Sequence, residues 1–326
     1  MKLKGDELRF PAGAVLAERD PCDDMSCELA IKVDVDTLKG YLEGLPRLLD
    51  ILGKRKVRAS IFFSMGPDNS GKAVRRLLRR GVVSKMLRTR ALSACGLKTL
   101  LYGTFLEAPL IVSANPDILK RAVDEGHDCG IHCWDHVLWE DRLFGMSRDG
   151  IRGEFAKAME SFSRVAGSPP GSCAAPGWQV SADSLAVQDE LGFEYCSDVR
   201  GFMPFFPRIA AGESAPLRTL QIPTTLPVLD ELWGLDGIDS ESVNDRYFDL
   251  LEPETNVHTV RAELEGGNMS GVFTRFLDCC IEGEVAFATL RDVARRVKAA
   301  SSAGICDIGM AEIPGRAGKV AVQTRA

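Results

Sequence analysis

The chain has 326 residues, of which 45% are hydrophobic and 26% charged, so it can form one large globular domain or two small ones. Its net charge of −6 gives no general reason to expect nucleic-acid binding, and no run of about 18 apolar residues suggests a membrane span. Ten cysteines are scattered without a CxxC pair, and residues 1–24 lack a secretory signal, so we expect reduced thiols and a cytosolic location.

The first strand is predicted early in the chain. Residues 1–27 are rich in proline, glycine and acidic residues without a clear period, and we expect an extension outside the core fold. Residues 29–36 alternate between apolar and polar residues, which predicts a strand with one apolar and one charged face. Asp34 and Asp36 lie two apart on the charged face and point to the same side. One can bind a metal while the other stays free as a base.

The following segments alternate between helix and strand. Residues 41–53 have apolar residues at helical spacing, and residues 57–63 are typical of a strand, an order that favours parallel strands. Further helices are predicted at 115–125, 146–166, 181–191, 269–281 and 290–299, and further strands at 193–198, 220–223, 257–263 and 284–287. About seven alternations over residues 28–299 predict an α/β fold of the (β/α) barrel type. Residues 300–326 are predicted to be a disordered tail.

A basic segment interrupts this alternation. Residues 69–106 contain nine lysines and arginines and no acidic residue, with apolar residues at helical spacing between them. One interpretation is a solvated basic helix on the surface of a large domain. The other is an amphipathic surface that lies on anionic lipid or binds a phosphate.

Three of the four histidines fall within residues 127–136. His132 and His136 are four residues apart, a spacing that lets two imidazoles converge on one cation in a helix or in a loop that follows a strand. With Asp36 as the third ligand, they predict a metal-dependent hydrolase. The alternative is that both histidines cap or pack locally.

Other polar residues follow predicted strands in the same way. Asp198 and Arg200 come at the end of one predicted strand, and Glu263 at the end of another. Because the chemistry of β/α barrels lies at the carboxyl ends of the strands, this shared location predicts one common site.

With these residues placed, the chain resembles the polysaccharide deacetylase (NodB-homology) superfamily, and within it the 4-deoxy-4-formamido-L-arabinose-phosphoundecaprenol deformylases. The DxD at 34–36 and the HxxxH at 132–136 are characteristic of the superfamily. The ASIFF and GPDN stretches within 59–69 and the SDxRG at 197–201 are more specific to the deformylase branch. The other matching stretches are 172–178, 222–227 and 262–266.

The resemblance implies a distorted seven-stranded (β/α) barrel over residues 28–299, with an insertion at 69–106 and one divalent metal ion. Zinc is the first expectation for two histidines and one carboxylate, with manganese or cobalt as alternatives. It also implies removal of a formyl group from an undecaprenyl-phosphate-linked aminosugar at the cytoplasmic face of the bacterial inner membrane. The product would serve lipid A modification and polymyxin resistance, and residues 70–98 would contact the anionic membrane.

The resemblance also implies residue roles. Asp34 takes the role of general base, with a second metal ligand or a structural cap as alternatives. The family places the histidine that acts as general acid where this chain has Arg261, which stays protonated and does not readily shuttle a proton. His258 faces the opposite side of a regular strand, but a bulge would re-aim it. Otherwise the acid is water or a carboxylate, or activity is reduced.

The remaining expectations concern substrate contacts. The family implies that Asp198 orients the acid, and here it is expected to pair with Arg261 instead. Arg200 would supply a charge that the family takes from an arginine absent here, and Trp178 either stacks on a sugar or walls the pocket. Glu263 is expected to hydrogen-bond the substrate. The alternatives to a deformylase are a deacetylase of another N-acylated sugar and a catalytically reduced sugar-phosphate-binding homologue.

Overall fold

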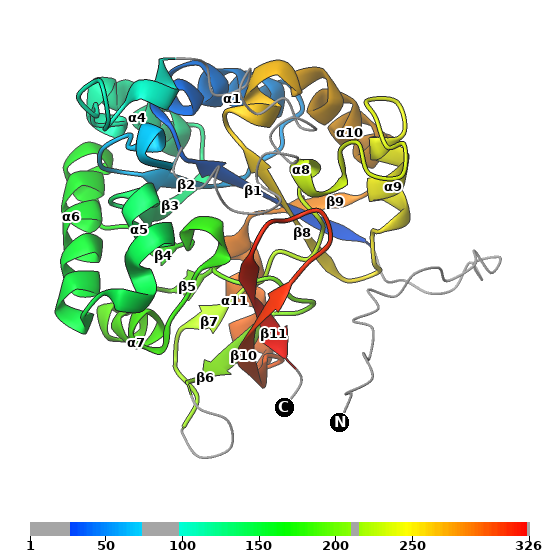
Figure 1. The fold of residues 1–326 in the computed structure, drawn as a ribbon. Helices are drawn as coiled ribbons and strands as arrows, with labels where there is room; N and C mark the ends of the chain where they lie inside the picture. Colours follow the sequence, from blue (N-terminus) through cyan, green and yellow to red (C-terminus); the bar gives the residue numbers. More distant parts are fainter. Residues whose placement is uncertain (1–26, 74–97, 210–214, 325–326) are drawn as a thin grey trace, which may run out of the picture.

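Seven parallel strands form the centre of the computed structural model, which describes residues 27–73, 98–209 and 215–324 (Figure 1). Their order around the centre is β8-β1-β2-β3-β4-β5-β7. The backbone amides of Thr225 and Leu226 donate to the carbonyl of Val257, which joins the segment after β7 to β8 and closes the ring. The predicted (β/α) barrel is therefore confirmed. The strands are β1 (Glu28–Val35), β2 (Ser60–Ser64), β3 (Asp128–Cys133), β4 (Ser172–Cys173), β5 (Tyr195–Cys196), β7 (Leu220–Gln221) and β8 (Thr255–Arg261).

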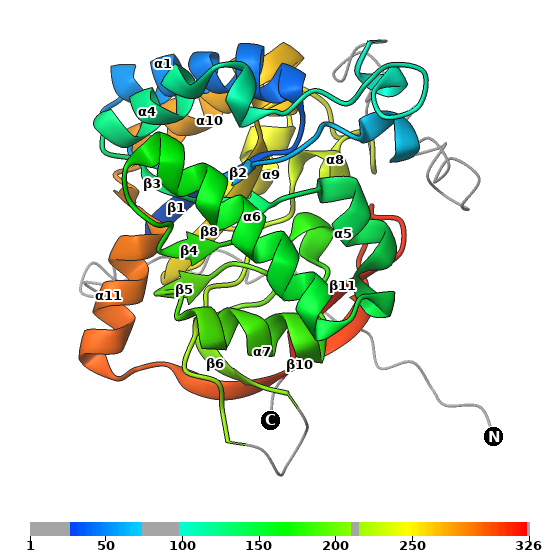
Figure 2. The same cartoon turned by 90° about the vertical axis from the view of Figure 1, so that its left-hand side faces the viewer.

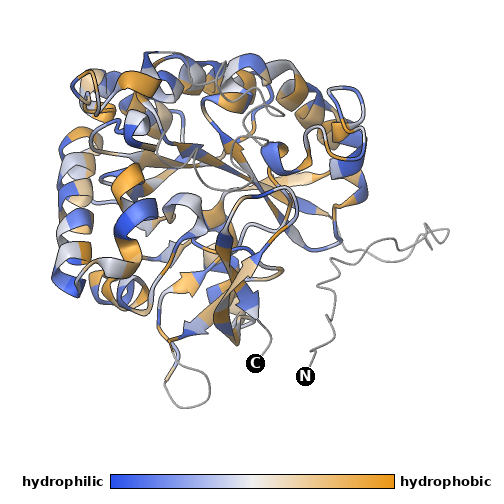
Figure 3. Ribbon diagram, viewed as in Figure 1, coloured by the Kyte–Doolittle hydropathy of each residue, from blue (hydrophilic) through white to orange (hydrophobic). Residues whose placement is uncertain are grey.

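Helices surround these strands, as Figures 1 and 2 show from two sides. They carry both hydrophilic and hydrophobic residues along their length (Figure 3), as expected for elements with one face on the core and one on the solvent. In α1 the inner face is four buried leucines, each of which stabilises the fold by roughly 1.5–3 kcal/mol. The helices are α1 (Leu45–Lys54), α4 (Pro116–Asp124), α5 (His136–Arg142), α6 (Arg148–Ala166), α7 (Ala182–Leu191), α8 (Leu229–Leu232), α9 (Val243–Asp249), α10 (Ser270–Glu282) and α11 (Leu290–Ala300).

The central strand β1 is buried on both of its faces. Its odd-numbered residues from Leu29 to Val35 belong to the main hydrophobic core, together with the leucines of α1. Its even-numbered residues include Lys32 and Asp34, which face the inside of the ring and are also buried. The alternation in the sequence thus predicts the two faces, and it places charged side chains inside the barrel.

The C-terminal segment is not a disordered tail, and this prediction was wrong. Strands β10 (Gly304–Glu312) and β11 (Lys319–Thr324) form an antiparallel hairpin, which continues the sheet through β6 (Phe205–Arg208). A short strand β9 (Ala286–Ala288) pairs with β1. The hairpin is ordered because its apolar residues are buried: Ile313 and Val320 pack with Trp178 and Val228 in a small core of their own.

The turn of this hairpin reaches α8 (Figure 1). Gly315 has φ of 75°, a left-handed conformation that favours glycine, and a side chain at this position would collide with the backbone carbonyl of Glu231. This close approach fixes the turn, including Arg316, against the body of the barrel.

The predicted N-terminal extension, up to residue 26, and most of the basic segment, residues 74–97, lie outside the described residues. The described part that follows the basic segment, residues 98–106, contains a short helical turn at Thr99–Leu101 and several exposed apolar side chains, among them Phe105 at 86% exposure. No helix in the described part of the chain is long and apolar enough to cross a bilayer.

Candidate metal centre

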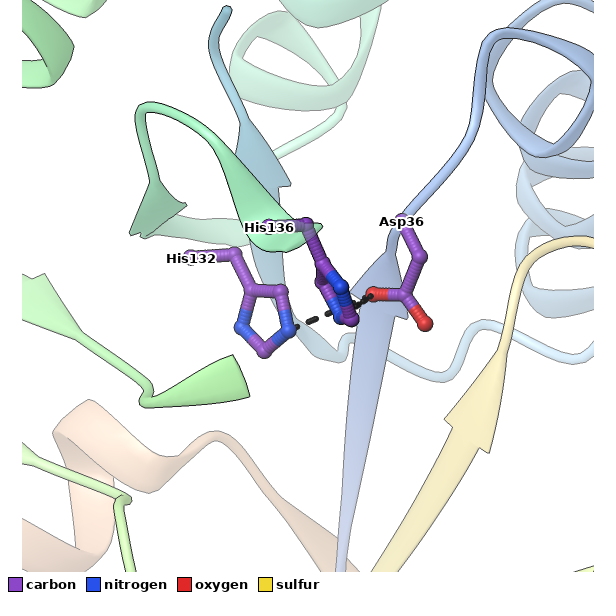
Figure 4. A group of neighbouring side chains, drawn as sticks. All are labelled: Asp36, His132 and His136. Atoms are coloured by element: carbon purple, nitrogen blue, oxygen red, sulfur yellow. Dashed lines mark ion pairs between the residues drawn. The ribbon is translucent and has the colours of Figure 1, made fainter. Parts of the chain in front are cut away.

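Asp36, His132 and His136 converge at the carboxyl ends of the central strands (Figure 4). Asp36 follows β1, His132 lies near the end of β3, and His136 is the first residue of α5. The Asp36 Oδ1 atom is 3.2 Å from His132 Nε2 and 3.4 Å from His136 Nε2. The predicted ligand set therefore comes together from residues about a hundred positions apart, and local packing of the histidines does not describe this geometry.

The donor atoms fit a divalent metal ion. The three ligand atoms lie within 4.8 Å of one another, and buried Asp36 Oδ1 has no hydrogen-bond partner of regular geometry. Burial would raise the pKa of Asp36, but the charges of His136 and His132 outweigh it and hold this pKa well below its usual range. An ionised carboxylate and two imidazoles together form a donor set that is typical of catalytic metal sites.

The loop between the two histidines is fixed by Asp135. Its carboxylate caps α5 by accepting a hydrogen bond from Leu138 N at 3.0 Å, and it accepts a second from Asn69 Nδ2 at 2.6 Å. His136 Nδ1 lies 3.9 Å from Glu140 Oε2, one turn further along α5. The cap thus sets where α5 begins and where His136 points.

Asp34 lies beside this cluster, as predicted, with a partner that sequence reasoning missed. The Nζ atom of Lys32 is 3.7 Å from Asp34 Oδ2 and donates a hydrogen bond to the Ser197 carbonyl at 2.9 Å, and its side chain is fully buried. The charge of Asp34 also raises the pKa of His132, against the effect of burial. The signal for Lys32 was present in the sequence, because it occupies the same face of the strand as Asp34.

Asp198 is buried in the barrel, but it does not pair with Arg261, and that prediction was wrong. Gln221 Nε2 donates to Asp198 Oδ2 at 2.8 Å, and burial raises the pKa of Asp198 to about 6. The sulfur atoms of Cys173 and Cys196 lie 3.2 Å apart next to it, and both are free thiols. Because the Lys32 ammonium already supplies positive charge there, this second group does not require a metal.

Arg261 pairs instead with Asp230 of α8, and 31% of its side chain is exposed. It is the register partner of Asp34 in the adjacent parallel strand, so both side chains lie on the same side of the sheet. Asp230 was missed because nothing in the sequence links two charged residues that lie 31 positions apart on different elements.

Arg200 does not offer its charge to a ligand, contrary to the prediction. Its Nη1 atom contacts both carboxylate oxygens of Glu231, at 2.9 and 2.8 Å, and its Nη2 atom donates to the Leu226 carbonyl. Trp178 is buried beneath this guanidinium, and its indole donates to Thr224 Oγ1 at 3.2 Å. Of the two roles considered for Trp178, the wall of the site is the one that the structure supports.

His258 does not lie with the other predicted site residues at the metal centre. The pairing of β8 with β1 is regular over its whole length, without the bulge that would re-aim this side chain. The imidazole packs instead against Tyr247 and Phe276 on the outer side of the sheet, with ring centroids 4.5 and 5.1 Å away. Burial lowers its pKa to about 3, so it stays neutral there. Its predicted catalytic role is therefore corrected to a packing role.

This burial gives a testable pH dependence. Below pH 6.5 the unfolded chain protonates His258 while the folded chain resists protonation down to about pH 3, so the free energy of unfolding falls as the pH drops through this window. Since each pKa unit corresponds to about 1.4 kcal/mol, the full contribution is on the order of a few kcal/mol. Urea unfolding from pH 7 to pH 4 should show a shallower decline for His258→Leu than for the parent. Parallel declines would contradict this assignment.

Glu263 follows the end of β8 and caps a helical turn (Leu264–Asn268) that contains Glu265, so it does not lie on the strand predicted for residues 257–263. Burial, together with the charge of Asp36, raises the pKa of Glu263 well above its usual range. Glu265 Oε2 accepts a hydrogen bond from the Arg261 amide at 2.8 Å, and burial raises its pKa to about 7. Glu263 therefore lies at the metal centre as predicted.

The chain is similar in sequence to known proteins. The family model for polysaccharide deacetylases matches residues 36–196. A protein of Shewanella sediminis named "Probable 4-deoxy-4-formamido-L-arabinose-phosphoundecaprenol deformylase" is 36% identical over 264 residues, covering 81% of this chain and 84% of that protein. A protein of the same name from Wigglesworthia glossinidia brevipalpis is 30% identical, covering 86% of this chain and 97% of that protein.

The fold has counterparts among solved structures. The crystal structure of a "probable Polysaccharide deacetylase" from Pseudomonas aeruginosa superposes with a TM-score of 0.57 at 15% identity. The superposition covers 83% of this chain and 91% of that one. At this identity the likeness concerns the fold, and it agrees with the barrel described above.

Proposed function

This chain belongs to the polysaccharide deacetylase family and is a hydrolase of amide carbon–nitrogen bonds, and we propose that it deformylates 4-deoxy-4-formamido-L-arabinose linked through a phosphate to undecaprenol. The observation that carries the proposal is the 36% identity, over most of both chains, to a protein named for this reaction. The convergence of Asp36, His132 and His136 beside Asp34 supports it independently.

The metal-holding residues in this proposal are Asp36, His132 and His136. A divalent ion bound there would polarise the formyl carbonyl and lower the pKa of water. Two imidazoles and one carboxylate favour zinc, with manganese or cobalt as alternatives.

Asp34 is proposed as the general base. An amide resists hydrolysis because water is a poor nucleophile, and an ionised carboxylate beside the site can accept a proton from the attacking water. Lys32, 3.7 Å from Asp34 Oδ2 and hydrogen-bonded to a backbone carbonyl, holds that carboxylate in place without competing for the proton, because an ammonium group has no acceptor.

The departing amine needs a proton, and the chain departs here from the expected pattern. Arg261 stays protonated, and His258 lies on the other side of the sheet. The proton is therefore proposed to come from water or from a carboxyl group at the site. Glu263 is proposed to hydrogen-bond the substrate, since its side chain lies against Asp36.

A turnover assay separates the candidate functions. Purified, metal-loaded protein should release formate from a short-chain phosphodiester of the 4-formamido sugar, and should act much more slowly on the matching 4-acetamido compound. The reverse preference would identify a deacetylase of another N-acylated sugar. Binding of both compounds without release of either acid would identify a catalytically reduced homologue, for which Arg261 is the relevant feature.

The proposed substrate carries a long lipid, so the protein would work at the cytoplasmic face of the inner membrane, in lipid A modification and polymyxin resistance. Residues 70–98 are proposed to contact the anionic surface, since nine basic residues lie within 69–106 without an acidic one. The exposed apolar side chains of Leu101, Phe105 and Leu106, which directly follow, would extend that contact.

Changing Arg75, Arg76, Arg79 and Arg80 to glutamine is expected to reduce sedimentation with anionic liposomes. Each basic residue near such a surface contributes about 1 kcal/mol, screened by salt, so the reduction should be largest at low ionic strength. Turnover of a water-soluble analogue should stay near normal, whereas turnover of the long-chain lipid should fall. Equal liposome binding by parent and variant would assign this segment to a solvated surface.

A further inference from the structure

Two arginines from distant parts of the chain lie together beside the metal centre. Arg261 ends β8, where Asp34 is its register partner, and Arg316 lies in the turn between β10 and β11. Although burial lowers it, the pKa of Arg261 is raised by Asp230 and also by Asp36 of the metal centre. Arg261 in turn acts on Arg316, whose pKa it helps to lower. Arg261 pairs with Asp230, and Arg316 Nη1 lies 3.8 Å from Oε1 of Glu231, the next residue of α8, so the two guanidinium groups are neighbours at the same end of the barrel as the metal ligands.

The position of Arg316 is fixed by the fold. Its guanidinium carbon lies 4.6 Å from the centre of the Trp178 ring, and Nη2 donates to the Gly177 carbonyl at 3.3 Å. The turn that carries it is held by Gly315 against Glu231 and by the small core around Trp178. Arg316 is thus held in one place before any ligand arrives, which reduces the entropy cost of binding.

Three arginines share two carboxylates as ion-pair partners here. Arg200 and Arg316 both contact Glu231, and Arg261 pairs with Asp230, while Asp36 and Glu265 act on Arg261 as more distant charges. Glu231 makes its short contacts with Arg200, and Arg316 Nη1 reaches Glu231 Oε1 only at 3.8 Å. Burial lowers the pKa of Arg316, Glu231 and Asp230 act against this, and the charges of Arg261 and Arg200 lower the pKa further. An anion bound here would relieve this repulsion.

Resting on the proposed function, we propose that Arg316 and Arg261 bind the phosphate group of the substrate and so position the sugar for hydrolysis. Unlike Arg200, both reach the surface, with 14% and 31% of their side chains exposed. A planar guanidinium group can donate two parallel hydrogen bonds to two oxygen atoms of one phosphate group. The phosphate is attached to the sugar at the opposite end of the ring from the formamido group, so its subsite must lie beside the metal centre and not within it.

The test compares two water-soluble substrates of the same formamido sugar, a short-chain phosphodiester and an uncharged methyl glycoside. Arg316→Met keeps the packing on Trp178 but removes the charge. Arg316→Lys keeps a positive charge but lacks the planar guanidinium group with its paired hydrogen-bond donors. The matched control is Arg208→Gln, which breaks the 2.8 Å pair with Asp307 at the far end of the same hairpin.

Arg316→Met should raise KM for the phosphodiester about 10- to 100-fold, the usual cost of a lost charged hydrogen bond, with little change in kcat. KM for the methyl glycoside should not change, Arg316→Lys should recover part of the loss, and Arg208→Gln should match the parent on both substrates. An equal rise in KM on both substrates, or no rise on either, would overturn the proposal.

If neither substrate is turned over by the parent, the proposed function fails, and the subsite is then decided by binding. Calorimetry on the metal-loaded parent should show tighter binding of the phosphodiester than of the methyl glycoside, with the difference lost in Arg316→Met. Equal affinity of the parent for the two compounds, or a difference that survives in Arg316→Met, would overturn the subsite.

Discussion

His132→Ala is expected to lose its divalent metal and, with it, nearly all turnover. The mutation removes one of the three ligand atoms that converge on this point, and two protein ligands fall short of the three that catalytic zinc sites normally use. Since even the loss of an outer hydrogen-bond partner typically weakens metal binding about 10- to 100-fold, loss of a direct ligand should exceed this range. Elemental analysis of the purified protein and kcat/KM on the formamido substrate measure the two effects.

The matched control for this experiment is His258→Leu. It also removes a buried histidine from a central strand, but one that packs against Tyr247 and Phe276 on the outer side of the sheet. It should retain the metal and near-normal turnover. Full metal content in His132→Ala would end the assignment of this ligand, whatever happened to activity.

Asp34→Asn is expected to keep the metal and lose about 10²- to 10⁴-fold in kcat, the usual effect of removing a positioned general base. Asparagine has nearly the same shape as aspartate, so the contact with Lys32 loses its charge while the strand keeps its packing. The three proposed ligand atoms are left in place. The measurement is single-turnover formate release together with metal content.

The Asp34→Asn and Asp36→Asn variants are expected to differ in metal content, so comparing them distinguishes the base from the ligand. Asp36→Asn should reduce metal content, whereas Asp34→Asn should not. If metal is lost from Asp34→Asn and kept in Asp36→Asn, the two residues have exchanged roles.

The parts of the site that could be predicted are those set by local spacing. Strand alternation places Asp34 of β1 on the same side as Asp36, which directly follows the strand. The interval between His132 and His136 spans the end of β3 and the first residue of α5. Both patterns are consequences of backbone geometry, which depends on residues close in sequence. The same strand alternation predicts that His258 lies on the outer face of the sheet unless a bulge intervenes. The pairing of β8 with β1 is regular, so His258 lies on the outer face.

The parts that could not be predicted depend on contacts between distant segments. Nothing near Arg200 indicates that Glu231 will neutralise it, and nothing near Arg261 indicates Asp230. The C-terminal hairpin has a composition of small and basic residues typical of a mobile tail. Its order comes from Ile313 and Val320 packing on Trp178, more than a hundred positions away. Such burial overrides local composition, and a single sequence does not reveal it.

The paired thiols inside the barrel have a practical consequence for chemical labelling. Burial raises the pKa of both Cys173 and Cys196, so neither forms a reactive thiolate while the barrel is closed, whereas Cys279 is exposed on α10. An alkylating reagent therefore modifies Cys279 in the folded protein and reaches the inner pair only during openings of the neighbouring strands. The rate at which Cys173 and Cys196 become alkylated thus reports the free energy of barrel opening under native conditions.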